Sequence, residues 1–218
     1  LVQGGAAFDP AGKDGVAEKI TEQAVPSGRL DSVWCVPELK DLLTKLGAKV
    51  EIKPSPESVC FVAPYGHDAT STALQLKLDP ARTVAVDRLF GFSKRRTLMT
   101  TPVTLPEVRD AAHALLASDG VPVSVIRDSA GFVAQRVVAH IVNVGCDIVQ
   151  QRIASPEDLD SAVGVGLGYP HGPLAMGDAL GAPKILAILE AMHSFYGESR
   201  YRPSPWLKRR ARLGVSLL

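Results

Sequence analysis

The chain has 218 residues, 46% of them hydrophobic and 22% charged, which is enough apolar material for one large folded domain or two small ones. Its 24 basic and 23 acidic residues leave a net charge of +1. No global field therefore draws the protein to nucleic acid or to an anionic membrane, and we predict neither as a partner.

The cysteines and the start of the chain indicate the cellular compartment and the extent of the polypeptide. The three cysteines, Cys35, Cys60 and Cys146, are widely spaced and form no Cys-x-x-Cys pair. This pattern favours a reducing, cytoplasmic compartment and predicts no metal site. No apolar run of about 18 residues is present, so we expect no transmembrane helix. The chain begins at Leu1 without a methionine or a signal sequence, and we interpret it as a piece of a longer polypeptide.

The first 127 residues predict an α/β region preceded by a linker. Residues 1 to about 30 have a helical pattern only at Gly15–Gln23 and a turn at Pro26–Gly28. Strands and helices then alternate at a spacing that indicates a partly parallel layer. The expected strands are 32–36, 49–53, 58–63, 83–86 and 121–126, and the expected helices are 37–46, 67–78 and 106–119.

Residues 128–218 predict an all-helical domain. Asp128 and Ser129 offer side-chain oxygens to the free amides that open a helix, and Gly131 permits a tight turn there. Ser155 followed by Pro156 is a second capping arrangement. The expected helices are 132–152, 156–165, 183–196 and 205–213.

Three segments in this order carry a family resemblance: Val121–Arg136, Ser155–Asp160 and Gly168–Leu174. The set resembles the C-terminal domain of 3-hydroxyacyl-CoA dehydrogenases. The resemblance implies a fold of class α/β followed by all-α, in which a degenerate Rossmann-like half precedes the helical domain. It also implies that Gln135 stands where the family has an asparagine that faces the substrate. The alternative is that Gln135 caps a helix or bonds across a helix pair.

The chemistry that such an enzyme needs is missing from this chain. Its nicotinamide site requires a strand followed by G-x-G-x-x-G, and the nearest approaches are Gly4-Gly5 and the Gly164–Gly168 run. The family's general base is a histidine assisted by a glutamate about a dozen residues later. Asp87 stands where that histidine is expected. We therefore assign no catalytic, cofactor-binding or metal-binding residue, and only Gln135 as a candidate substrate contact.

Three further features have a functional and a structural interpretation. Arg200–Arg212 gathers basic residues around two aromatics, which suits phosphate or nucleic acid, but a solvated helix face explains it better. Lys94–Arg96 could steer an anionic acyl-CoA, and we expect it to be a solvated loop. His171 is expected to be a packed turn residue.

The layout resembles most closely the second half of long, two-copy 3-hydroxyacyl-CoA dehydrogenases. The resemblance implies that an acyl-CoA is the substrate, that NAD binds upstream of this segment, and that the segment packs on the first helical copy or forms a homo-oligomer. It would provide packing and one wall of the substrate cleft. A competing hypothesis is a non-catalytic helical assembly or dimerisation module, and a third is a nucleic-acid binder that uses the C-terminal basic helix.

Overall fold

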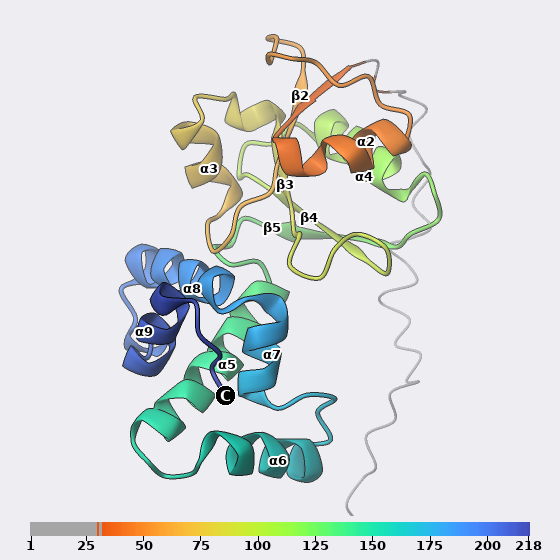
Figure 1. Cartoon of the computed structure of the whole chain (residues 1–218). Coiled ribbons are helices and arrows are strands. Elements are labelled where there is room, and N and C mark those ends of the chain that lie inside the picture. Colours follow the sequence, from red (N-terminus) through yellow and green to blue (C-terminus); the bar gives the residue numbers. More distant parts are fainter. Residues whose placement is uncertain (1–29, 31) are drawn as a thin grey trace, which may run out of the picture.

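The structure is a computed structural model that describes Leu30 and residues 32–218. The expected linker, with its helical stretch at Gly15–Gln23 and its turn at Pro26–Gly28, lies outside the described residues. Figure 1 shows a sheet flanked by helices, joined at one edge to a bundle made only of helices. The chain passes from one part to the other through residues 128–133.

The sheet has five strands in chain order. β1, β2 and β3 are parallel, β4 is antiparallel to β3, and β5 is parallel to β4. The bounds are β1 Val33–Cys35, β2 Val59–Val62, β3 Thr83–Val86, β4 Arg96–Thr100 and β5 Val123–Arg127.

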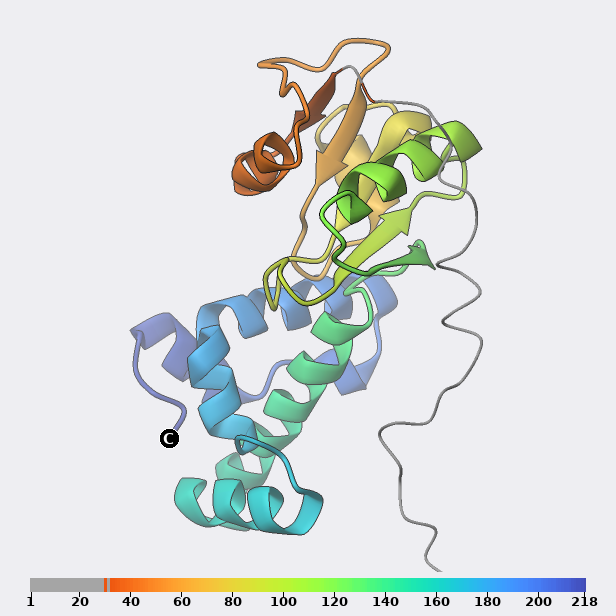
Figure 2. The same cartoon turned by 90° about the vertical axis from the view of Figure 1, so that its right-hand side faces the viewer.

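Helices cover both faces of the sheet (Figures 1 and 2). They are η1 Pro37–Leu39, α2 Lys40–Lys45, α3 Ala69–Gln75, η2 Pro80–Arg82 and α4 Pro106–Ala117. Side chains of a strand alternate between the two faces. Phe61 therefore joins a core with α2 and α4, whereas its neighbours Cys60 and Val62 join a core with α3. Burial on both faces explains why β2 and β3 read as continuous apolar runs.

The bundle is built around one central helix, α5, which contacts α7, α8 and α9. Its buried side chains share one apolar core with residues of the surrounding helices. The bounds are α5 Ala134–Gln150, α6 Pro156–Leu167, α7 Pro173–Leu180, α8 Ala182–Tyr196, η3 Ser199–Tyr201 and α9 Pro205–Leu213. None of the described helices is long and apolar enough to cross a membrane.

One expected strand is absent from the structure, and two elements were not predicted. Residues 49–53 form no strand: only Val50 bridges to β1, and Ile52 is 96% exposed, so the segment has nothing to pack against. The strand β4 was missed because it begins inside the basic run at Arg96. Helix α7 was missed because its eight residues follow the Gly172-Pro173 turn, which suggested a loop.

Candidate functional site

Gln135 lies at the junction of the two parts, with its side chain fully buried. Its amide nitrogen donates to Asp87 Oδ1 at 2.9 Å and to the Pro64 carbonyl at 3.2 Å. Its amide oxygen accepts from the Gly66 N–H at 2.8 Å. The side chain therefore faces the sheet, as a position one helical turn after Gly131 suggests. Both of its polar atoms are engaged by protein groups.

Asp87 stands where the family resemblance places the histidine base. Asp87 follows β3, is 8% exposed, and accepts hydrogen bonds from the Leu89 N–H and from Gln135.

The carboxyl ends of the parallel strands are occupied by the chain's own side chains. Arg88, two residues after β3, lies 4.1 Å over the ring of Tyr65, which follows β2. Its guanidinium also pairs with Glu38, in η1 after β1, at 2.7 Å. In doubly wound sheets a nucleotide binds at this edge, where the strand order reverses. The described strands show no such reversal.

The glycines at 164–168 do not rescue a phosphate site. Gly164 and Gly166 lie inside α6, and Gly168 ends that helix with a φ of 67°. The carboxyl end of a helix carries a partial negative charge, which repels phosphate.

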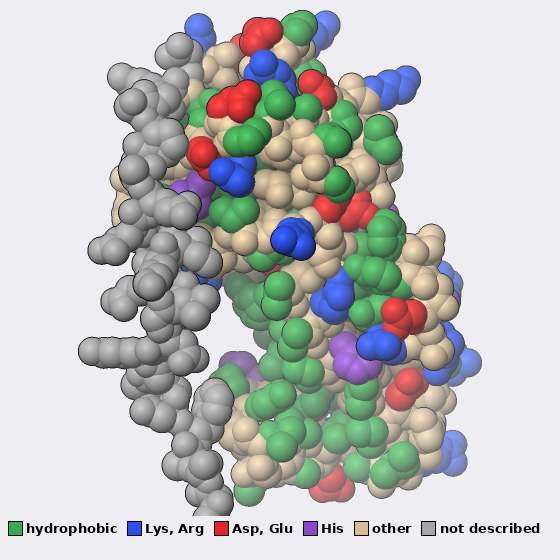
Figure 3. Space-filling view, turned by 180° about the vertical axis from the view of Figure 1, so that it is seen from behind, with side chains coloured by type: hydrophobic (Ala, Val, Ile, Leu, Met, Phe, Trp, Pro, Cys, Tyr) green, Lys and Arg blue, Asp and Glu red, His purple; other side chains and the backbone are tan. Residues whose placement is uncertain are grey.

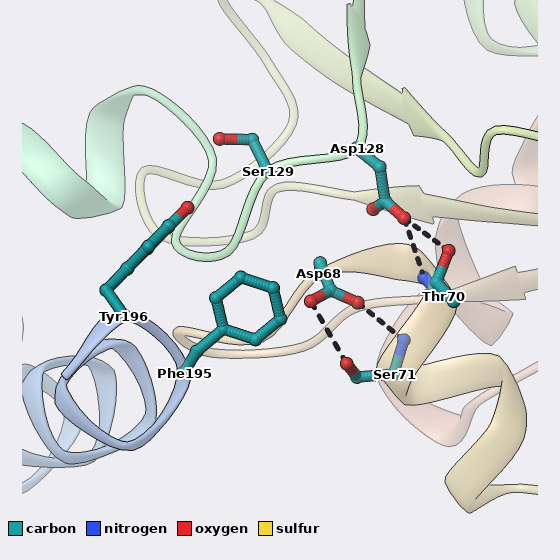
Figure 4. A pocket seen from close by; sticks show the side chains of 7 residues that line it. All are labelled: Asp68, Thr70, Ser71, Asp128, Ser129, Phe195 and Tyr196. Atoms are coloured by element: carbon teal, nitrogen blue, oxygen red, sulfur yellow. Dashed lines mark hydrogen bonds between the residues drawn. The ribbon is translucent and has the colours of Figure 1, made fainter.

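A cavity of about 280 Å³ lies between α3, the turn after β5 and the end of α8, lined by the side chains in Figure 4. Asp128 accepts from the Ala69 N–H at 2.7 Å and the Thr70 N–H at 3.1 Å, and Asp68 accepts from the Ser71 hydroxyl at 3.0 Å. The expectation that Asp128 caps the helix that follows it was wrong. It caps α3, fifty-odd residues upstream, because folding brings that free helix end beside it.

An apolar groove of about 390 Å³ lies between α5, α7 and the loop that contains Phe90. Val138 and Ile141 of α5 form its floor together with Phe90, which lies in the loop after Asp87. His171 lines the groove from the turn before α7 and is exposed, so the expectation of a packed turn residue was wrong. The remaining lining residues are Tyr169, Pro170, Met176, Ala179 and Leu180. No single motif pointed to this groove, because its walls come from three separate segments.

The two basic runs differ in the structure. The expectation that Lys94–Arg96 is a solvated loop was wrong for Arg96, which is 3% exposed and pairs with Asp119. In the C-terminal run, Lys208 and Arg212 each approach Glu190 at 3.6 to 3.7 Å, and Arg210 stacks on Trp206 at 3.9 Å. The C-terminal run is therefore an ion-paired helix face, and the nucleic-acid hypothesis gains no support from it.

The three cysteines are buried, and burial makes their thiols unreactive. Burial raises the pKa of the Cys60 thiol to about 11 and that of Cys146 to about 12, so neither is a thiolate at neutral pH. Among the described residues, no cluster of three or more histidines, cysteines or carboxylates could hold a metal ion.

Comparison with known proteins assigns the helical part. Residues 131–216 match the family model of the 3-hydroxyacyl-CoA dehydrogenase C-terminal domain. The chain is 37% identical over 158 residues to the 3-hydroxyadipyl-CoA dehydrogenase of Escherichia coli, covering 72% of this chain and 32% of that protein. It is 37% identical over 89 residues to a probable 3-hydroxybutyryl-CoA dehydrogenase of Bacillus subtilis, covering 41% and 31%.

A solved structure agrees. The crystal structure of an Escherichia coli 3-hydroxybutyryl-CoA dehydrogenase superposes with a TM-score of 0.62 at 36% identity, covering 70% of this chain and 31% of that one. The chain thus spans about a third of the length of these relatives. The match confirms the resemblance drawn from the sequence, and residues 131–216 belong to the 3-hydroxyacyl-CoA dehydrogenase C-terminal domain family.

Proposed function

We propose that this chain is the C-terminal, second-copy part of an NAD-dependent 3-hydroxyacyl-CoA dehydrogenase. The whole enzyme would oxidise the 3-hydroxyl of an acyl-CoA to the 3-oxo group, with NAD and the catalytic base held outside this segment. The observation that carries the proposal is the junction itself. There Asp87 and Gln135, which the resemblance places at reactive positions of the family, are buried and hydrogen-bonded to each other.

The lengths of the matches support a second copy. The 158 matched residues are 32% of the Escherichia coli relative, whereas 89 matched residues are already 31% of the Bacillus subtilis relative. The first relative is therefore much the longer protein. Its match must also extend beyond residues 131–216 into the sheet, although the sheet lacks a cofactor loop.

For the substrate cleft we propose that the apolar groove beside Phe90 and Val138 forms the wall that this segment contributes. The surface that the lining residues expose to the groove is apolar, which suits an alkyl or acyl group. For Gln135 we propose the packing role, because its buried amide is already bonded on both atoms.

We expect the isolated chain to bind NADH with a dissociation constant weaker than about 10 µM, or about −7 kcal/mol. The reason is that Arg88, Tyr65 and Glu38 fill the strand edge where the nicotinamide half would lie. Calorimetric titration measures this, with the longer parent polypeptide as the positive control. Tight binding by the isolated chain would refute the proposed division of labour.

The partner of the bundle is proposed to be the first helical copy, or a second copy of this chain in its absence. Val137 and Val144 of α5, together with Val133 just before the helix, are 52%, 43% and 59% exposed. Hydrophobic side chains gather over the helical part in Figure 3. An apolar stripe of this kind is typical of a helix with a neighbour on its outer face.

We expect the isolated chain to self-associate through this stripe, and Val137→Lys to abolish the association. Burying an unpaired ammonium in an apolar contact is costly. Sedimentation velocity measures the effect, and Ile52→Lys is the matched control because Ile52 is 96% exposed in the loop before β2, away from the stripe. An isolated, unsubstituted chain that stays monomeric at high concentration would contradict the assignment.

The non-catalytic assembly module remains the second candidate, and the same two observations favour it: the altered reactive positions and the exposed stripe. Sequence upstream of Leu1 distinguishes the two. A G-x-G-x-x-G strand–helix start followed by an H-x-x-N-P segment supports the enzyme.

A further inference from the structure

We propose that Gln135 and Asp87 form a clamp that makes the sheet and the helical bundle unfold as one cooperative unit. Residues at reactive positions of the family would here serve as positioning residues between the two parts. This inference does not rest on the proposed function, because it concerns only contacts within the described chain.

The first half of the clamp is the buried Asp87 carboxylate. It is 8% exposed, and in the described part of the chain no lysine, arginine or histidine forms an ion pair with it. Its oxygen Oδ1 instead accepts from Gln135 Nε2 at 2.9 Å and from the Leu89 N–H at 3.0 Å. The stability of a buried carboxylate depends on each of its hydrogen-bond donors. Loss of one donor leaves the free-energy cost of removing the carboxylate from water uncompensated. Gln135 is the donor that comes from the bundle.

The second half is the loop between β2 and α3. Gln135 accepts from the Gly66 N–H at 2.8 Å and donates to the Pro64 carbonyl at 3.2 Å. One bundle side chain therefore satisfies groups that follow two neighbouring strands. An alanine at this position would leave several buried polar groups without a partner.

Packing around the clamp is reciprocal. Leu89, whose N–H is held by Asp87, lies in the core of the bundle. Phe132, three residues before Gln135, lies in the core between the sheet and α3. Each part thus completes the core of the other, and the clamp fixes the register at which both insertions occur.

The chain provides one reporter for each part. Trp34 lies in β1 and packs against the core between the sheet and α3, whereas Trp206 lies in α9 and packs against the core of the bundle. In a Trp206→Phe background the fluorescence of Trp34 reports unfolding of the sheet. In a Trp34→Phe background the fluorescence of Trp206 reports unfolding of the bundle. In urea we expect the two midpoints to coincide with the clamp intact. Gln135→Ala is expected to separate them, whereas Gln151→Ala, an exposed glutamine just after the same helix, leaves them together.

A double-mutant cycle keeps the proposal testable where alanine prevents folding. Gln135→Met retains the volume of the side chain and removes its hydrogen bonds, and Asp87→Ala removes the carboxylate. Each single substitution multiplies the unfolding equilibrium constant by a factor. We expect the factor for the double variant to be at least about tenfold smaller than the product of the two single factors. Additive effects, coincident midpoints in Gln135→Met, or separate midpoints in the unmodified clamp would each overturn the proposal.

Discussion

Gly66→Ala is expected to destabilise the protein by about 3 kcal/mol or more in free energy of unfolding. Gly66 has a φ of 75°, which an alanine adopts only with strain. A Cβ atom there would also lie 2.6 Å from the Ile188 carbonyl oxygen and 2.7 Å from the Ala191 Cβ. Because these atoms belong to the body of α8, the helix itself must shift.

Gly120→Ala is the matched control for this prediction. Its φ of 82° imposes the same backbone strain, but a Cβ atom there meets nothing within 4 Å. The control is expected to cost only about 1–2 kcal/mol. Urea unfolding of both variants, followed by circular dichroism, measures the difference. Equal losses would show that the sheet and α8 are not in close contact at Gly66.

Arg96→Met is expected to cost about 2–3 kcal/mol, because the buried guanidinium makes several charge-assisted hydrogen bonds. It donates to both carboxylate oxygens of Asp119 at 2.7 Å, to the Phe92 carbonyl at 3.0 Å, and to the Leu116 carbonyl near the end of α4. Methionine retains much of the apolar stem but none of these bonds. Arg109→Met, which removes an exposed pair with Asp110, is the control and is expected to change stability little.

The ion pair between Arg96 and Asp119 also predicts how stability changes with pH. The hydrogen bond from Arg96 is the largest cause that lowers the pKa of Asp119 from 3.8 to about 2. A carboxyl whose pKa is lower in the folded state stabilises that state above pH 4, and the contribution is lost as the pH falls from 4 toward 2. The urea midpoints of unfolding at pH 7 and pH 3 should therefore differ more for the unsubstituted protein than for Arg96→Met. An equal difference in the two proteins would show that Arg96 does not stabilise the ionised Asp119 carboxylate.

Much of the architecture could be predicted from local patterns. Apolar runs bounded by glycine and proline indicated β2 and β3, and helical spacing indicated α4, α5 and α8. These signals succeed because the spacing of apolar residues within an element shows which of its faces are buried. The strand β4 escaped because Arg96, a residue typical of surfaces, is buried through a carboxylate 23 positions away.

The candidate site divides in the same way. The missing glycine loop and the replacement of the expected histidine by Asp87 are properties of the sequence, and they determine what chemistry this segment lacks. Whether Gln135 faces a substrate or another part of the protein is not a local property. Its partners Asp87 and Pro64 are 48 and 71 positions away. Only the tertiary structure brings them within hydrogen-bond distance, because a buried amide bonds to whichever polar groups the packing of sheet and bundle places beside it.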